Sequence, residues 1–363
     1  MKTIFRIGTR GSALALWQAT WASDRLAVAR PDVTFELVTI HTSGDKDRTT
    51  PLPFLEGQGA FTREIEGALM DGRIDLAVHS LKDMPTVQPE GLAVVAVGPR
   101  EDPRDVLVLR PELAAGSATE SPATAAAIAS FPYSLLPKGA VIGTSSLRRR
   151  AAVLAARPDL RVRDLRGNLD TRLAKVRRGE LDAAVLAAAG ILRLGAWPAG
   201  TVYLDPGAFP PAPGQGVVAL EARSDDAETR LLASLLEDRA ALLAITAERT
   251  FLNELHGGCR VPVAAFADFA TPGYLRLQGV VASPDGRRVI RVECRREVSA
   301  EADRGTALAL AEVLGLEAAI AARRQGAAEV LDAVREAIGL AAAAAATAAV
   351  GADGVSHDDT EKK

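Results

Sequence analysis

The feature that most constrains the fold is an alternation of β-rich runs and helical patterns along the first hundred residues. A run at 3–9 precedes a helical pattern at about 13–29, and a second run follows at 35–40. The order strand, helix, strand is typical of parallel α/β sheets, in which ligands lie at the ends of the strands. A further helical pattern near 63–70 and later β-rich runs extend this first lobe.

The same alternation resumes at 140, after a stretch rich in Pro, Ala, Ser and Thr that we interpret as a surface insertion. A rigid, turn-rich segment at 209–216 then leads into an apolar run at 217–221, which can return the chain to the first lobe. The strands of this second α/β unit are expected at 140–144, 160–165 and 183–187, with helices at 146–156 and 169–178.

Beyond a helical pattern at about 239–255, the chain changes character. Two β-rich runs meet at the turn Ser283-Pro284-Asp285-Gly286, and sequential antiparallel strands indicate an α+β domain. We therefore predict three domains: two doubly wound α/β lobes and a smaller α+β domain with an antiparallel sheet. The predicted boundaries are 1–104 plus about 217–238 for lobe one, 105–216 for lobe two, 239–345 for the third domain and 346–363 for a disordered tail.

Composition excludes several classes of protein. The chain has 363 residues, of which 48% are hydrophobic and 25% charged, as in ordinary globular proteins. Its net charge of −3 argues against a protein that coats nucleic acid. The two cysteines, Cys259 and Cys294, and four scattered histidines suggest neither a disulfide framework nor a metal site. With no secretory signal and no span of about 20 strongly apolar residues, a cytoplasmic protein is expected.

Arginine is concentrated in one part of this acidic chain. Residues 148–193 contain eleven Arg and one Lys against five acidic residues, an excess of about seven positive charges. Arg148 and Arg149 follow a strand-to-helix junction, Arg166 follows the next strand, and Arg10 repeats the pattern in the first lobe with Ser12 as the expected helix N-cap. Guanidinium groups at several strand ends suit a ligand with many carboxylates or phosphates. For arginines such as Arg157, a solvated helix face is the favoured interpretation.

Three other segments each allow two interpretations. Asp83, just after a strand, either caps a turn before Pro85 or acts as a lone carboxylate that stabilises a cation and moves protons. The segment 57–61, which contains two glycines, resembles a phosphate loop without the Walker lysine and is equally consistent with a mobile cover. Cys259 in His256-Gly257-Gly258-Cys259-Arg260 is either a buried structural thiol or a reactive one, whereas Cys294 is expected in the core.

Taken together, the motifs resemble the porphobilinogen deaminase (hydroxymethylbilane synthase) family. The resemblance extends from about residue 6 to residue 267, and more loosely through the third domain. The segments that carry it are Ile7-Gly8-Thr9-Arg10-Gly11-Ser12, Leu16-Trp17-Gln18-Ala19, Ala77-Val78-His79-Ser80-Leu81-Lys82-Asp83, Arg100-Glu101-Asp102-Pro103-Arg104-Asp105, Gly143-Thr144-Ser145-Ser146-Leu147-Arg148-Arg149, Leu165-Arg166-Gly167-Asn168 and His256-Gly257-Gly258-Cys259.

The resemblance implies two lobes like those of type II periplasmic binding proteins around a cleft, and a third domain that carries a covalent dipyrromethane cofactor on Cys259. It implies a transferase that joins four porphobilinogen molecules head to tail, releases ammonia and frees hydroxymethylbilane, with Asp83 as the catalytic carboxylate. The matching cofactor-binding positions are Ser80, Lys82, Thr144, Ser145, Ser146, Arg148, Arg149, Arg166 and Gly167. The matching substrate-binding positions are Arg10, Ser12, Arg172 and Arg193.

Two features depart from the family pattern. Gln58 stands where the family often has lysine, so a charged contact from the cover is missing or is supplied by Arg63. The insertion at about 114–131 and the alanine-rich C-terminal extension also lie outside the pattern. A monomer without nucleic-acid or membrane partners is expected, with porphobilinogen as its small-molecule substrate.

Three rival functions remain at this point. A non-catalytic anion-binding protein of the periplasmic-binding type would share the two lobes, but it would need neither Asp83 nor Cys259. A nucleic-acid-binding module is disfavoured because only 4% of the residues are aromatic and no stacking platform accompanies the arginines. An acyltransferase that uses the Cys259 thiol would lose activity with that thiol and carry no bound chromophore.

Overall fold

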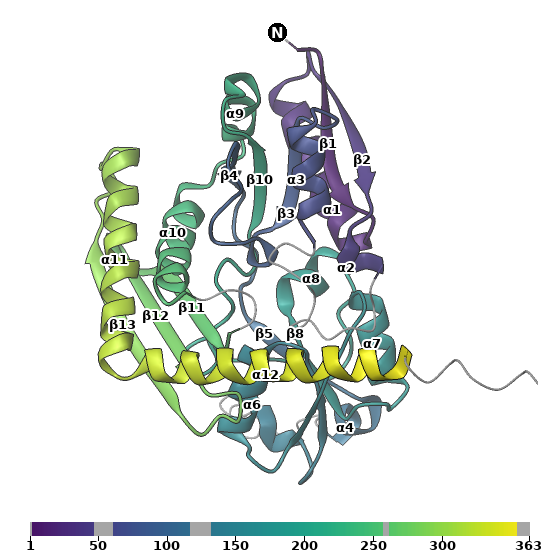
Figure 1. Cartoon of the computed structure of the whole chain (residues 1–363). Helices are drawn as coiled ribbons and strands as arrows, with labels where there is room; N and C mark the ends of the chain where they lie inside the picture. The colour runs from purple at the N-terminus through teal and green to yellow at the C-terminus, as the bar shows by residue number, and fades with distance from the viewer. Residues whose placement is uncertain (1, 47–60, 117–131, 257–260, 354–363) are drawn as a thin grey trace, which may run out of the picture.

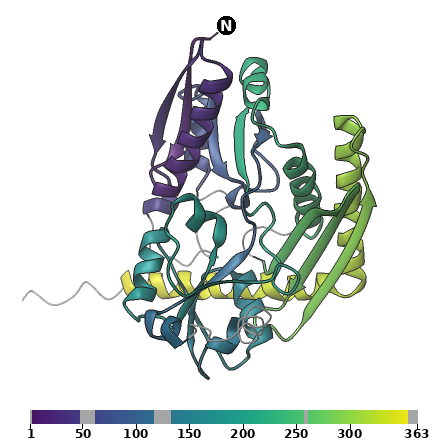
Figure 2. The same cartoon turned by 180° about the vertical axis from the view of Figure 1, so that it is seen from behind.

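The computed structural model describes residues 2–46, 61–116, 132–256 and 261–353 (Figure 1). Within these residues the strands form two five-stranded sheets and one three-stranded sheet. Figures 1 and 2 show the three-stranded sheet to one side of the two larger sheets.

The first sheet belongs to lobe one and has helices on both faces. Its strand β1 is parallel to β2 and β3, whereas β10 is antiparallel to both of its neighbours. Helix α1 (Ala13–Ala29) packs on one face against Phe5 and Ile7, and α3 (Arg63–Met70) packs on the other against Ile74. In spatial order the strands are β2 (Thr34–Ile40), β1 (Ile4–Arg10), β3 (Leu76–Ser80), β10 (Val218–Arg223) and β4 (Leu92–Val97).

The second sheet repeats this arrangement in lobe two. Strand β6 is parallel to β7 and β8, and β5 is antiparallel to β8 and β9. Helix α6 (Leu147–Ala156) packs on one face, and α7 (Leu169–Arg177) with α8 (Ala188–Arg193) packs on the other. In spatial order the strands are β7 (Arg161–Arg163), β6 (Val141–Gly143), β8 (Ala183–Ala187), β5 (Asp105–Leu109) and β9 (Thr201–Tyr203).

The two sheets therefore share one topology. In each, the strand that enters from the other lobe is antiparallel and lies between the third and the fourth strand of its host lobe: β10 in lobe one and β5 in lobe two. This exchange of one strand is the arrangement of doubly wound type II periplasmic-binding-protein lobes. The predicted fold class is confirmed, and the predicted domain boundaries stay a prediction.

The third domain is an antiparallel sheet covered by helices. Strands β11 (Val263–Thr271), β12 (Tyr274–Ala282) and β13 (Val289–Glu297) pair in sequence order. Helices α10 (Arg239–Glu254) and α11 (Arg304–Arg324) pack against this sheet and against each other. They approach so closely that a Cβ on Gly315 would lie 2.5 Å from the backbone oxygen of Ala247, so glycine is required there. Figures 1 and 2 place α11 on the side away from the lobes.

The last two helices, α12 (Ala327–Asp353) and α11, differ from a disordered tail and from a typical surface helix, respectively. Helix α12 continues past 346, where we expected a disordered tail to begin. Helix α11 is long and apolar enough to meet a length-and-composition test for a membrane span. This is weak support for a span, because its residues Ala311, Leu314 and Ala318 are fully buried in the third-domain core.

Two chain crossovers join the lobes, at 98–104 and 204–217, and they are hydrogen-bonded to each other. Glu101 N donates to Gly216 O at 3.0 Å. Glu248 of α10, which is fully buried, binds both crossovers: it pairs with Arg100 at 2.6 Å and accepts from Gly214 N at 2.7 Å. It also accepts from Ala267 N of β11 at 2.8 Å. One carboxylate thus fastens the third domain to the hinge between the lobes.

We expect Glu248→Leu to lower the melting temperature by about 6 °C or more, because removing one partner of a buried pair costs about 3 kcal/mol. The matched control is Asp71→Ala, which removes the exposed pair with Arg73 and should leave the melting temperature nearly unchanged. Differential scanning calorimetry measures both variants. Equal melting temperatures for the two would contradict the role given to Glu248.

Candidate active site

The predicted catalytic carboxylate lies where β3 ends. The residues that follow this strand form a single 3₁₀ turn, Leu81–Asp83, closed by a hydrogen bond from Met84 N to Leu81 O at 3.1 Å. Leu81 is buried beneath the turn and Asp83 is exposed. The buried side chain of Leu81 therefore fixes the turn to the core, and the Asp83 carboxylate is left exposed to solvent.

The hydroxyl residues predicted at the strand ends fix local structure. Ser12 caps α1 by accepting from Ala15 N at 3.3 Å, as predicted, and Ser146 caps α6 by accepting from Arg149 N at 3.4 Å. Ser80 exchanges hydrogen bonds with the buried amide of Gln18 on α1. Thr144 and Ser145 tie the loop after β6 to its neighbours, through Ser146 N and through the backbone of Leu165, respectively.

Arg148 and Arg149 lie in the first turn of helix α6 and both pair with one carboxylate, Asp105 of β5. The Nη2 atoms of Arg148 and Arg149 lie 2.7 and 2.6 Å from its two oxygens, and all three side chains are buried. Burial alone would raise the pKa of Asp105, but the two guanidinium groups outweigh it and hold the pKa at about 2. The Asp105 carboxylate thus compensates one of the two positive charges inside lobe two.

Gln215 connects this cluster to the residue beside Asp83. Its Nε2 donates to Asp105 Oδ1 at 2.9 Å and to Pro103 O at 2.7 Å. Its Oε1 accepts from Lys82 Nζ and from Arg149 Nη2, each at 3.4 Å. Asp105 and Gln215 were not predicted as site residues, although Asp105 ends one of the motifs that carry the family resemblance and Gln215 lies in the turn-rich segment 209–216.

Two further cations, Lys82 of lobe one and Arg172 of lobe two, interact electrostatically with Asp83. Burial is the main cause that lowers the pKa of Arg172 to about 10, and the charge of Arg149 is the next. The negative charge of Asp83 opposes this shift, whereas the positive charges of Arg166 and Arg10 add to it. Burial also lowers the pKa of Lys82 to about 8, with Asp83 opposing and Arg149 contributing. Cations from lobe one and lobe two thus act on the same small region. Arg172 additionally donates to Gly167 O at 2.7 Å, and Arg10 lies over the Phe61 ring at 4.3 Å.

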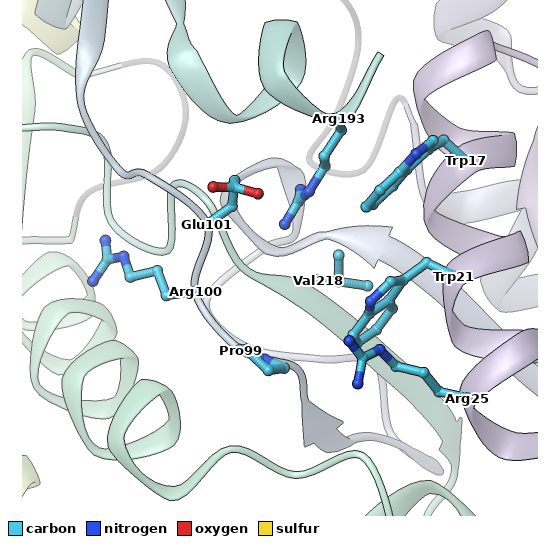
Figure 3. Close-up of a pocket in the computed structure, with 8 residues that line it drawn as sticks. All are labelled: Trp17, Trp21, Arg25, Pro99, Arg100, Glu101, Arg193 and Val218. Carbon is cyan, nitrogen blue, oxygen red and sulfur yellow. The ribbon is translucent and has the colours of Figure 1, made fainter. Parts of the chain in front are cut away.

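Arg193 lies elsewhere, at the hinge. Its Nη2 donates to Gly216 O at 2.6 Å, and its guanidinium group lies 5.6 Å from the centre of the Trp17 ring. Arg193, Trp17, Trp21 and Glu101 line a pocket of about 190 Å³. Figure 3 shows their side chains around it. No contact described in the structure brings Arg193 to Asp83.

Two predicted features fall outside the described residues: Cys259, and most of the segment 57–61 including Gln58. Cys294 lies on β13, half-buried against the third-domain core, where burial raises the pKa of its thiol. Among the described residues, no group of three or more His, Cys, Asp and Glu side chains is arranged to hold a metal ion.

The donor set fits a ligand with several carboxylates. The pKa values of Lys82 and Arg172 are lowered partly because other cations stand close by, and a bound carboxylate would relieve that repulsion. Guanidinium and ammonium groups are also the donors that bind carboxylates most strongly. The fold and these residues together define the class: a two-lobed protein of the type II periplasmic-binding architecture with a cationic site at its strand ends and an added α+β domain.

Comparison with known proteins assigns the family. Residues 5–231 match the family model "Porphobilinogen deaminase, dipyromethane cofactor binding domain", and residues 242–321 match "Porphobilinogen deaminase, C-terminal domain". The chain belongs to the porphobilinogen deaminase family. This result does not favour the alternative of a non-catalytic binding protein.

Curated relatives named porphobilinogen deaminase match nearly the whole chain. The protein of Acidithiobacillus ferrooxidans is 44% identical over 92% of this chain and 98% of its own length. That of Thermus thermophilus is 43% identical over 91% and 98%, respectively. Among solved structures, the periplasmic aliphatic sulphonate binding protein SsuA from Escherichia coli matches 70% of this chain and 71% of its own at 15% identity and a TM-score of 0.34. The fold class rests on the strand order and not on this likeness.

We expect Lys82 to titrate at about pH 8 and Asp83→Asn to lower that midpoint, because the Asp83 carboxylate stabilises the ammonium form. Reductive methylation with ¹³C-formaldehyde followed by NMR titration measures it, and the signal is assigned by its loss in Lys82→Arg. The control Asp71→Asn, at an exposed site on lobe one, should leave the midpoint in place. A Lys82 midpoint near that of an ordinary lysine would contradict the described burial.

Proposed function

We propose that this chain is a deaminating transferase that joins four porphobilinogen molecules head to tail and frees hydroxymethylbilane, a step of tetrapyrrole biosynthesis. The observation that carries the proposal is one exposed carboxylate, Asp83, which follows Lys82 of lobe one and interacts electrostatically with Arg172 of lobe two. Each porphobilinogen brings an acetate and a propionate, so a growing chain accumulates carboxylates. A basic region around a single acid suits such a ligand.

Asp83 is the group that we place at the reacting atoms. Loss of ammonia from porphobilinogen and attack on the resulting electrophile both pass through positive charge near a pyrrole nitrogen. A fixed carboxylate stabilises that charge and accepts the pyrrole N–H, and it can take up the proton that leaves the α-carbon. The 3₁₀ turn holds Asp83 in place, because Leu81 anchors it in the core.

The residues of this chain would hold a dipyrromethane through its carboxylates. Lys82, Arg149 and Arg166 are the proposed cationic partners, with Arg148, Ser80, Thr144, Ser145, Ser146 and Gly167 as further contacts. Cys259 is the proposed point of thioether attachment. When bound, this group supplies a free pyrrole α-carbon as the nucleophile for the first condensation. Arg10, Ser12, Arg172 and Arg193 are proposed to bind the substrate and the added rings.

Because Arg148 and Arg149 already pair with Asp105, we propose that they also keep this part of the site in a fixed geometry for the ligand. The two arginines and the buried aspartate together carry a net charge of +1, and two ion pairs of 2.7 and 2.6 Å hold the arginines in place. A rigid cation loses little conformational entropy on binding, which favours a tight carboxylate contact.

The finer organisation is part of the proposal. We propose that 1–104 with about 217–238, 105–216, and 239–345 act as three domains. We also propose that the protein is a cytoplasmic monomer without nucleic-acid or membrane partners. The burial of α11 in the third-domain core supports the last point.

The covalent primer is tested by intact mass. Denatured wild-type protein should carry an adduct of two linked pyrrole units, before or after incubation with porphobilinogen, and Cys259→Ser should carry none. Cys294→Ser is the matched control and should retain the adduct, because that thiol lies on β13 with a raised pKa. An adduct that persists in Cys259→Ser would place the attachment at another residue.

Replacing the proposed catalytic carboxylate tests its role. We expect Asp83→Asn to keep the adduct but to lower kcat by roughly 100-fold or more, because a neutral amide cannot stabilise the developing positive charge. Product formation under saturating porphobilinogen measures kcat. The exposed Asp71→Asn variant should retain wild-type turnover. Near-normal turnover in Asp83→Asn would remove Asp83 from its role.

A further inference from the structure

The amide of Gln215 has only one orientation that satisfies its partners. Asp105 Oδ1 and Pro103 O are both acceptors, at 2.9 and 2.7 Å, so the NH₂ group must face them. The carbonyl oxygen must then face the opposite way, toward Lys82 and Arg149. Gln215 is 1% exposed, so water cannot easily replace any of these partners.

The two cations that share this oxygen come from different lobes. Lys82 follows β3 in lobe one and is the neighbour of Asp83, whereas Arg149 begins α6 in lobe two. Each donor nitrogen lies 3.4 Å from Oε1, longer than the usual N–H···O distance of about 2.7–3.2 Å, so both contacts are weak hydrogen bonds. The like charges of Lys82 and Arg149 repel each other, and a carbonyl dipole between them reduces that repulsion without cancelling either charge.

The backbone around Gln215 fixes the amide from both sides. Gly214 N donates to Glu248 of the third domain, and Gln215 O accepts from Arg100 Nε at 3.0 Å. Gly216 O accepts from Arg193 of α8. The backbone at Gly216 has φ +90°, and a Cβ there would lie 2.3 Å from Glu101 O, so only glycine fits. The crossover is thus held by all three domains.

We propose that Gln215 is a positioning residue that sets the spacing of Lys82 and Arg149 across the two lobes, so that both cations face the carboxylates of the bound polypyrrole together. This inference rests on the proposed function for the identity of the ligand. The geometry of the cluster does not depend on it.

A neutral amide is the side chain that this position requires. Glutamate has the same shape but no N–H, so it would place a second carboxylate beside Asp105 and would neutralise a cation that the ligand needs. Methionine fills the space but offers neither donor nor acceptor. Glutamate adds a negative charge beside Lys82, whereas methionine removes the carbonyl dipole, so the two substitutions change the electrostatic potential at Lys82 in opposite directions. The other charged groups that act on Lys82 are Asp83, Asp105 and Arg148.

The first test needs no activity. In ¹³C-methylated protein, the titration midpoint of Lys82 should move to higher pH in Gln215→Glu and to lower pH in Gln215→Met. The exposed Gln325→Met variant is the matched control and should leave the midpoint unchanged. The added charge of Gln215→Glu raises the midpoint whatever the role of Gln215, so the downward shift in Gln215→Met is the result that separates the proposal from a purely structural role. Unchanged midpoints in both variants, or shifts of the same sign, would overturn the proposal.

The second test separates binding from turnover. We expect Gln215→Met to lower kcat/KM for porphobilinogen about tenfold, mainly through KM, and to have much less effect in a Lys82→Met background, because coupled residues are not additive. Full additivity of the two changes would count against the proposal. If wild-type protein forms neither adduct nor product, the proposed function fails, while the titration still decides the role of Gln215.

Discussion

The structure depends on one buried carboxylate at the point where the chain enters lobe two. Asp105 begins the strand that carries the chain into lobe two, and it has no solvent exposure. An ionised buried carboxylate is tolerated only when it is paired and hydrogen-bonded. Arg148, Arg149 and Gln215 meet this requirement, and in doing so they fix the start of α6 and the return crossover.

The same logic recurs at the junction with the third domain. Glu248 is buried on α10 and takes its partners from the two crossovers and from β11. The hinge of the molecule is therefore built from charged residues whose pairing needs all three domains. Such pairing adds little net stability compared with apolar packing, but it specifies one relative placement, because a misplaced domain would leave a buried charge without a partner.

Much of the fold and part of the site could be predicted from the sequence. The alternation of β-rich and helical patterns predicted the α/β lobes, and Ser12 was predicted as the N-cap of α1. Both predictions depend on residues that are close together in the sequence. Asp105 and Gln215 were missed, since an aspartate at a strand start and a glutamine in a Gly-Gln-Gly segment have many ordinary uses. Arg193 was predicted with the other arginines by resemblance; it lies at the hinge pocket, and its role in substrate binding stays a prediction.

The sequence by itself determined the local structure: the strand-and-helix order, the helix caps and the presence of Asp83 and the arginines just after strands. Each of these follows from short-range patterning and backbone geometry. Only the tertiary structure decided which charges meet. Four residues that are far apart along the chain meet because the crossover at 204–217 passes between the lobes: Lys82, Asp105, Arg149 and Gln215. Burial and neighbouring charge then set their pKa values, and neither is defined until the chain has folded.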